Sequence, residues 1–183
     1  MIITILNGNM QPEPNGFSIY VSDLTRRLQK DHTVNHFQLR EMSISHCTGC
    51  WACWWKTPGI CAIKDDMDRI FATIMASEFL IFASPIMRGF TSSLLKRMTD
   101  RLVTLLHPYI ILNNGECHHR KRYERYPDFG LLLEKEHDTD NEDIEIIRDI
   151  YDRFALNFHC KQRIVWLTDL HKTNEIAYDT NNI

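Results

Sequence analysis

The sequence predicts an α/β fold in which helices cover both faces of a five-stranded parallel sheet. Short segments of mostly apolar residues recur along the 183-residue chain, and amphipathic segments with helical spacing separate them. Strands that alternate with helices are typical of parallel sheets, because each parallel connection needs a crossover. The strand segments are also nearly continuous in apolar residues, as expected of strands that helices bury on both sides. We therefore expect a three-layer, doubly wound domain.

Five segments are expected to be the strands of this sheet. Each is short, rich in β-branched or aromatic residues, and bounded by turn residues or by a change of pattern. In chain order they are Ile2–Leu6, Thr33–Leu39, Phe79–Ala83, Gly130–Leu133 and Arg163–Thr168. The second alternates loosely between apolar and polar residues, so we expect it to be more exposed than the others.

Four amphipathic segments are expected to be the principal helices. Ser18 precedes the first of them and is its expected N-cap. The second opens at Asp65 and Asp66, whose carboxylates suit the positive end of a helix dipole. The third is expected from about Ser92 to Leu106 and the fourth from about Asp143 to Asn157, each with one apolar side.

Length and composition favour one globular domain over residues 1–183. The hydrophobic content of 44% and the charged content of 25% are ordinary for such a protein. Residues 46–64 are expected to form a cysteine-rich loop. The polar residues 113–126 are expected to form an excursion or hairpin before the fourth strand.

Charge and hydropathy argue against two classes of partner. The formal charge of −3 gives no basic surface for nucleic acid. No apolar run approaches the length that spans a membrane. The first residues lack the basic flank and cleavage site of a secretion signal, so we expect a cytoplasmic protein whose six cysteines are reduced, catalytic or bound to a cluster.

Three loops carry most of the functional information. In a doubly wound sheet, ligands bind beyond the carboxyl ends of the strands, near the point where strand order reverses. The loops at residues 8–18, 40–64 and 84–91 each follow a predicted strand. We therefore expect all three to meet on one rim of the sheet.

Four cysteines dominate the second of these loops. Cys47, Cys50 and Cys53 repeat at every third residue, and Cys61 follows, so that the four thiols can converge on one soft group. Thiolates of this kind bind iron–sulfur clusters or zinc. The sequence leaves open an iron–sulfur cluster, a zinc ion or free thiols buried among tryptophans.

Four landmarks follow one another in the order of a known family. They are the strand Ile2–Leu6 with Gly8; the four cysteines with Asp65, Asp66 and Met67; Ser84, Pro85 and Ile86; and Leu95 and Lys96 with Asp100 and Arg101. Over about the first 106 residues they resemble the flavodoxin-like NAD(P)H-dependent FMN reductase family, in particular its iron–sulfur flavoprotein branch. The resemblance implies the strand order 2-1-3-4-5.

The resemblance also implies a bound FMN. Its phosphate would lie in the first loop, against backbone N–H groups and the positive end of the first helix. The candidate residues are Asn9, Asn15, Gly16, Phe17 and Ser18. The family usually has a Ser-Pro-Arg-like sequence in this loop. Here Asn9-Met10-Gln11-Pro12-Glu13 supplies an acid and no cation.

The flavin ring would lie against the loop after the third strand. The candidate residues are Ser84, Pro85, Ile86, Met87, Arg88, Gly89 and Phe90. Family members often have Pro-Val-Tyr here, and this chain lacks the tyrosine. Phe90 or Trp51 could take its place as the aromatic partner of the ring.

In the iron–sulfur branch, a cysteine pattern like Cys47, Cys50, Cys53 and Cys61 binds a 4Fe–4S cluster. Trp51, Trp54 and Trp55 would shield that cluster from water. Asp100 and Arg101 are expected to form an ion pair on the helix surface or a contact with a partner subunit. Lys96 is expected to be solvated, within possible reach of the nucleotide.

The expected function is that of an FMN-dependent oxidoreductase without a catalytic side chain. NAD(P)H would donate electrons through the flavin to a soluble small-molecule or protein acceptor, in a homodimer or higher homo-oligomer. Two alternatives remain open from the sequence. One is a non-enzymatic electron carrier with flavin or an iron–sulfur cluster. The other is a cofactor-free or zinc-bearing binding module on the same fold.

Overall fold

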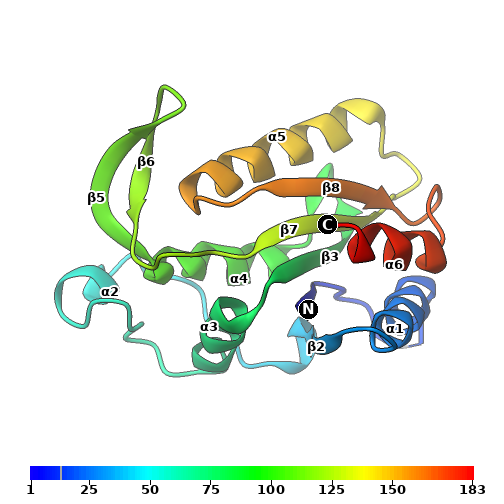
Figure 1. Ribbon diagram of the computed structural model, residues 1–183, viewed down its shortest axis with the longest axis horizontal. Helices are drawn as coiled ribbons and strands as arrows, with labels where there is room; N and C mark the ends of the chain where they lie inside the picture. The colour runs from blue at the N-terminus through cyan, green and yellow to red at the C-terminus, as the bar shows by residue number, and fades with distance from the viewer. Residues whose placement is uncertain (13) are drawn as a thin grey trace.

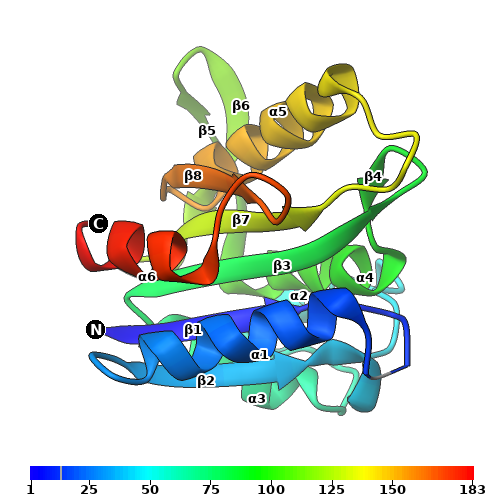
Figure 2. The same cartoon turned by 90° about the vertical axis from the view of Figure 1, so that its right-hand side faces the viewer.

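The computed structural model describes residues 1–12 and 14–183, and these residues form a three-layer α/β domain around a parallel sheet (Figures 1 and 2). Five parallel strands run in the order β2-β1-β3-β7-β8, which is the predicted order 2-1-3-4-5. Their bounds are Ile2–Asn7 for β1, Thr33–Gln38 for β2, Phe79–Met87 for β3, Asp128–Glu134 for β7 and Gln162–Leu167 for β8. The predicted fold class is therefore confirmed.

Two apolar cores form because helices cover both faces of this sheet. On one face, α1 (Gly16–Leu28) and α6 (Thr173–Asn181) pack on the sheet (Figure 2). On the other face lie α3 (Met67–Ala76), α4 (Ser93–Arg101) and α5 (Asn141–Asn157). None of the helices in the described parts of the chain has the length and apolar content needed to cross a membrane.

Helix α1 begins earlier than the sequence predicts. Its N-cap is Asn15 rather than Ser18, which is the third residue of the helix. The Asn15 side chain accepts a hydrogen bond from the Ser18 amide (2.9 Å), and the Ser18 hydroxyl accepts one from the Asn15 amide (3.0 Å). This reciprocal capping box satisfies two amides at once, and it explains why the helix includes Gly16 and Phe17.

The segment between α4 and β7 forms a hairpin that stands apart from the central sheet. Helix α4 continues into the 3-10 turn η2 (Leu102–Leu105), followed by β5 (Leu106–Asn113) and β6 (Glu116–Lys121). Asn114 and Gly115 connect the two strands with φ angles of 52° and 81°. Asn-Gly is the preferred sequence for a tight turn with two positive φ angles. The hairpin projects at the upper left of Figure 1.

Three short elements complete the chain. The 3-10 turn η1 (Leu39–Glu41) follows β2, and the single turn α2 (Ala52–Trp55) lies in the cysteine segment. Strand β4 (Phe90–Thr91) pairs antiparallel with the end of β3. Of these three elements, α2 lies away from the sheet, toward the hairpin β5–β6 (Figure 1).

Candidate functional site

Ser92 joins the loops that follow β1 and β3. Its hydroxyl donates a hydrogen bond to the Gly8 carbonyl (2.6 Å), and its amide donates to the Ser84 hydroxyl (2.9 Å). The Gly8 amide also donates directly to the Ala83 carbonyl (2.8 Å). Because Ser92 is the N-cap of α4 as well, this helix starts at the rim formed by the two loops. Two of the three predicted loops therefore meet.

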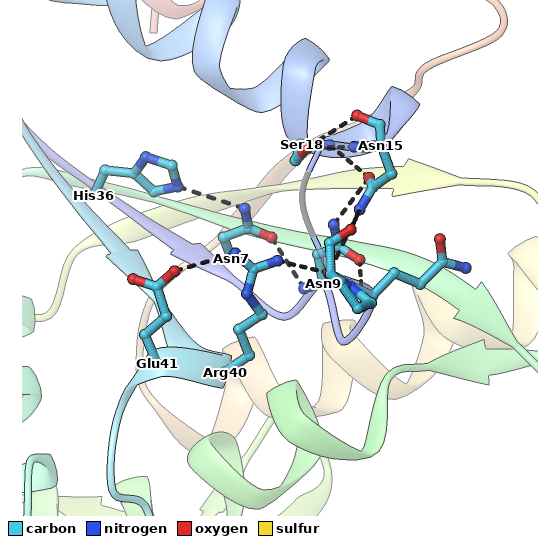
Figure 3. Close-up of polar contacts among 9 residues, drawn as sticks. Asn7, Asn9, Asn15, Ser18, His36, Arg40 and Glu41 are labelled. Carbon is cyan, nitrogen blue, oxygen red and sulfur yellow. Dashed lines mark hydrogen bonds and ion pairs between the residues drawn. The ribbon is translucent and has the colours of Figure 1, made fainter.

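Three asparagines hold the first loop in shape (Figure 3). The side-chain oxygen of Asn7 accepts a hydrogen bond from the backbone amide of Asn9 (3.0 Å). The side-chain oxygen of Asn9 accepts one from the backbone amide of Gln11 (3.1 Å). The Asn9 side chain also donates to that of Asn15 (3.1 Å). Asn9 is therefore buried beside the start of α1, next to the other predicted phosphate residues. Glu13 lies outside the described residues.

The start of α1 provides backbone N–H groups for an anion. The first intrahelical bond runs from Ile19 to Asn15, so the amides of Gly16 and Phe17 precede the repeating helical bonds. The Phe17 ring is buried in the core, and the Ser18 hydroxyl is engaged in the capping box. The two amides, rather than these two side chains, are thus the groups suited to a phosphate.

A cation reaches this loop from another part of the chain. Arg40, in η1 at the end of β2, donates a hydrogen bond to the Gln11 carbonyl (2.6 Å) and to the carboxylate of Glu41 (3.1 Å), and lies beside Asn9 in Figure 3. Arg40 therefore brings a positive charge beside the loop, where it is already paired with Glu41. Because Arg40 and Gln11 are 29 residues apart, no local sequence pattern predicts this contact.

An acid lies on the other side of the helix start. Glu134 is the last residue of β7, and a Cβ atom added to Gly16 would lie 4.0 Å from its Oε1. Burial raises the pKa of this carboxyl above its usual value. The sequence signal was its place directly after a buried strand, which puts it on the carboxyl rim.

The predicted ring-binding residues divide into buried and exposed sets. Ser84, Pro85 and Ile86 are buried at the end of β3, whereas Met87 and Arg88 are exposed. Arg88 and Gly89 form a turn with φ angles of 54° and 74°. Phe90 is half-buried and packs against the core, which leaves it as the aromatic candidate at this loop.

The four cysteines of the motif line one pocket. Its volume is about 120 Å³. The other residues that line it include Trp51, Trp54, Ile63, Arg101, Val103 and Thr104. All four thiols are free, with Cys47 and Cys50 exposed and Cys53 and Cys61 half-buried.

Two of the four thiols have shifted pKa values. Burial raises the pKa of Cys53, and the nearby Cys61, Cys47 and Cys50 raise it further. The pKa of Cys50 is lowered, first by the Ala52 backbone N–H.

The arrangement of these thiols bears on what they could bind. Across residues 1–12 and 14–183, no three His, Cys, Asp or Glu side chains are placed to hold a single metal ion. A tetrahedral zinc site would need such convergence, with zinc–sulfur distances of about 2.3 Å. A 4Fe–4S cubane takes four thiolates, one at each iron, and the four cysteines that line the pocket supply that number of ligands.

Trp54 fixes the cysteine segment to the hairpin. Its indole N–H donates to the Val103 carbonyl (3.3 Å), and its ring lies 4.9 Å from that of His119 on β6. Trp51 and Trp55 are 59% and 62% exposed. Of the three tryptophans expected to shield a cluster, Trp51 and Trp54 line the pocket, whereas Trp55 is not among its lining residues.

Arg101 departs most from the sequence interpretation. Its side chain is 1% exposed and pairs with Asp65 (2.5 Å) rather than with Asp100. Asp100 pairs instead with Lys96, and this second pair is on the surface. The reason is helical spacing, because Arg101 follows Leu94 and Met98 on the buried side of α4. The predicted surface pair of Asp100 and Arg101 is thus wrong.

The cysteine pocket and the rim lie at opposite ends of α4. Ser92 begins this helix at the rim, and Arg101 ends it at the pocket. Nine residues correspond to a length of about 13 Å at 1.5 Å per residue. Of the loop at residues 40–64, Arg40 reaches the rim, whereas α2 in the cysteine segment lies toward the hairpin β5–β6 (Figure 1). The prediction that all three loops meet on one rim is therefore wrong for the cysteines, and Trp51 lines their pocket at the Arg101 end of α4.

A known protein family matches most of this sequence. Residues 1–121 match the model of the NADPH-dependent FMN reductase family. The chain belongs to this family. The matched region contains β1, the joined loops after β1 and β3, the cysteine pocket and the hairpin β5–β6.

Two relatives of this chain are named iron–sulfur flavoproteins. The one from Clostridioides difficile (strain 630) is 34% identical over 111 residues, which cover 58% of this chain and 48% of that protein. The one from Methanosarcina thermophila is 27% identical over 114 residues, covering 62% and 59%. The match thus spans about half the length of these relatives.

A solved structure supports the fold. The NAD(P)H:quinone oxidoreductase from Methanothermobacter marburgensis superposes with a TM-score of 0.61 at 19% sequence identity, covering 91% of this chain and 84% of that one. At this identity the likeness shows the fold alone.

Proposed function

We propose that this chain is an FMN-dependent oxidoreductase that uses NAD(P)H to reduce the flavin and passes the electrons to a soluble acceptor. The observation that carries this proposal is the rim built by Ser92, which combines with the family match over residues 1–121. A single domain over residues 1–183, located in the cytoplasm, is part of the same proposal.

The residues at the rim suit the two ends of FMN. The amides of Gly16 and Phe17 and the guanidinium of Arg40 would hold the phosphate, with Asn9 and Asn15 fixing the loop. The segment from Ser84 to Phe90 would hold the ring, in part through backbone N–H groups. Bound FMN supplies the atom that accepts hydride. The side chains need only bind, orient and exclude water.

The test is FMN binding combined with turnover. Purified protein is expected to retain FMN and to oxidise NADH or NADPH with a small quinone, in a reaction that stops when the flavin is removed. A protein that binds FMN without oxidising either nucleotide would be an electron carrier instead. Failure to bind FMN after reconstitution would overturn the proposal.

We also propose that Cys47, Cys50, Cys53 and Cys61 hold a 4Fe–4S cluster. The shared pocket, the all-thiol donor set and the names of the relatives support this. Cys53→Ser is expected to lose most of the iron and sulfide that the native protein binds on anaerobic reconstitution. Cys117→Ser, which changes an exposed thiol on β6, is the control and should keep both. Equal iron content in the two variants would contradict the assignment.

We also propose that the protein forms a homodimer or larger assembly. The contact surface would be the exposed apolar side of the cysteine segment and the hairpin β5–β6. Trp51 and Trp55 are more than half exposed there, as are Ile110 and Leu112 on β5. Exposed apolar residues that gather on neighbouring elements are typical of subunit contacts. Light scattering at several concentrations would give the molecular mass.

Glu134→Gln is expected to strengthen FMN binding at high pH, by roughly tenfold if its charge lies near the phosphate. Because burial raises the pKa of Glu134, this carboxyl becomes charged at higher pH than an ordinary glutamate. As pH rises through that pKa, the new negative charge repels the phosphate, so the affinity of the native protein falls. The variant lacks this fall. The neighbouring pair of Lys135 and Asp169 (3.3 Å) is unchanged in it.

Flavin fluorescence titrations between about pH 5 and pH 8 would measure this difference. Riboflavin serves as the control ligand because it lacks the phosphate, so its affinity should be alike in both proteins. Parallel pH profiles for FMN would show that Glu134 does not face the phosphate.

A further inference from the structure

The guanidinium of Arg101 contacts both ends of the cysteine segment. Nη1 donates to the Ser45 carbonyl (3.4 Å), two residues before the first cysteine. Nη2 donates to the Cys61 sulfur and to the Ile63 carbonyl, both at 3.2 Å. One side chain on α4 therefore ties the beginning of the segment to its end.

Asp65 completes this link from the opposite side. Its carboxylate pairs with Nη1 of Arg101 and accepts hydrogen bonds from the amides of Ser45 (2.9 Å) and Met67 (3.1 Å). The two side chains are only 1% and 5% exposed. Water therefore competes little for these bonds, and the geometry around Cys61 is fixed by groups that are themselves held on several sides.

Arg101 also brings a positive charge to the sulfur of Cys61. Arginine stays protonated under all ordinary conditions, so this charge does not depend on pH. Hydrogen bonds and charges near the sulfurs are among the factors that set the potential of an iron–sulfur cluster. A cation stabilises the reduced state, which carries one more negative charge than the oxidised state.

We propose that Arg101 is a positioning residue that orders the cysteine segment and raises the reduction potential of the group bound by its four thiolates. The inference rests on the proposed cluster for its second half only. The step concerned is the gain of one electron, supplied in the test by dithionite, and no bond is made or broken. The ordering of the segment is a property of the protein without metal.

The test compares Arg101→Gln and Arg101→Lys with the control Lys96→Gln. Lys96 is on the same helix, and its surface pair with Asp100 makes it a matched loss of one positive charge. In reconstituted protein, a dithionite titration should give a more negative midpoint potential for Arg101→Gln than for the native protein and the control. Arg101→Lys keeps the charge, so its potential should lie closer to the native value.

Hydrogen exchange of the metal-free proteins tests the ordering separately. Amides of residues 45–64 should exchange faster in both Arg101 variants, because lysine cannot bond Ser45, Cys61 and Ile63 together, and at the native rate in Lys96→Gln. Unchanged exchange would overturn the positioning role. Unchanged potential with a full complement of iron would overturn the tuning role.

The two proposals fail in different ways. If the native protein takes up no iron and sulfide, the cluster and the tuning role are both overturned, while hydrogen exchange still decides the positioning role. If Arg101→Gln does not fold, Arg101→Lys supplies the exchange measurement, and Arg101→Met, which also lacks the charge, supplies the potential. An Arg101→Lys protein with native exchange rates would then contradict the proposal.

Discussion

Asp65→Asn is expected to lower the free energy of unfolding by about 3–5 kcal/mol, the usual cost of removing one partner from a buried ion pair. The variant leaves the guanidinium of Arg101 buried without a counter-charge, since the Arg101 side chain is 1% exposed. Asparagine keeps the size of the side chain and one oxygen, so the loss is that of charge. Most of the effect should appear in the cysteine segment and the end of α4.

Urea denaturation followed by circular dichroism would measure this loss. Asp68→Asn is the matched control, because Asp68 lies three residues further on and pairs with Lys64 on the surface (3.2 Å). Exposed pairs contribute about 0–1 kcal/mol. A loss for Asp65→Asn no larger than that of the control would mean that the buried pair contributes little.

Gly8→Ala is expected to have the second-largest effect, on both stability and FMN binding. A Cβ on Gly8 would lie 2.7 Å from the Ser92 hydroxyl oxygen and 2.8 Å from Cβ of Leu95. Overpacking of this kind costs about 1–3 kcal/mol. Because Ser92 joins the loops after β1 and β3, the displacement should also open the rim and weaken FMN binding.

Gly16→Ala provides the comparison for stability within the same loop. A Cβ there would meet nothing closer than Glu134, at 4.0 Å. Alanine also favours the first turn of a helix over glycine, so stability should stay level or rise. Thermal unfolding would rank the two variants, and a Gly8→Ala protein with native stability and native FMN affinity would contradict the role given to Gly8.

The sequence predicted the central sheet well because its signal is strong. Strands such as Phe79–Met87 are apolar throughout, and only a fully covered sheet buries them. Helix α6 was missed because its buried residues are Thr173, Ile176 and Thr180, which give a weak apolar pattern. The hairpin β5–β6 was only partly expected, although Asn114-Gly115 is a turn signal.

The site was predictable where neighbours in the chain define it. Asn9, Asn15 and Ser18 lie in one loop, and the structure brings them together. The partners of Arg101 were not predictable in this way, since Asp65 lies 36 residues away. The sequence also predicted that the cysteines follow β2. It did not show how far from the sheet the segment extends before α3 begins.

Helix α4 connects the two candidate sites, with one site at each of its ends. Ser92 holds the rim together at the amino tip, and Arg101 holds the sulfur-lined pocket at the carboxyl tip. Leu95 and Met98 pack this helix against the apolar core on its face of the sheet. Because α4 carries both residues, a substitution at Met98 that tilts the helix would displace Ser92 and Arg101 together.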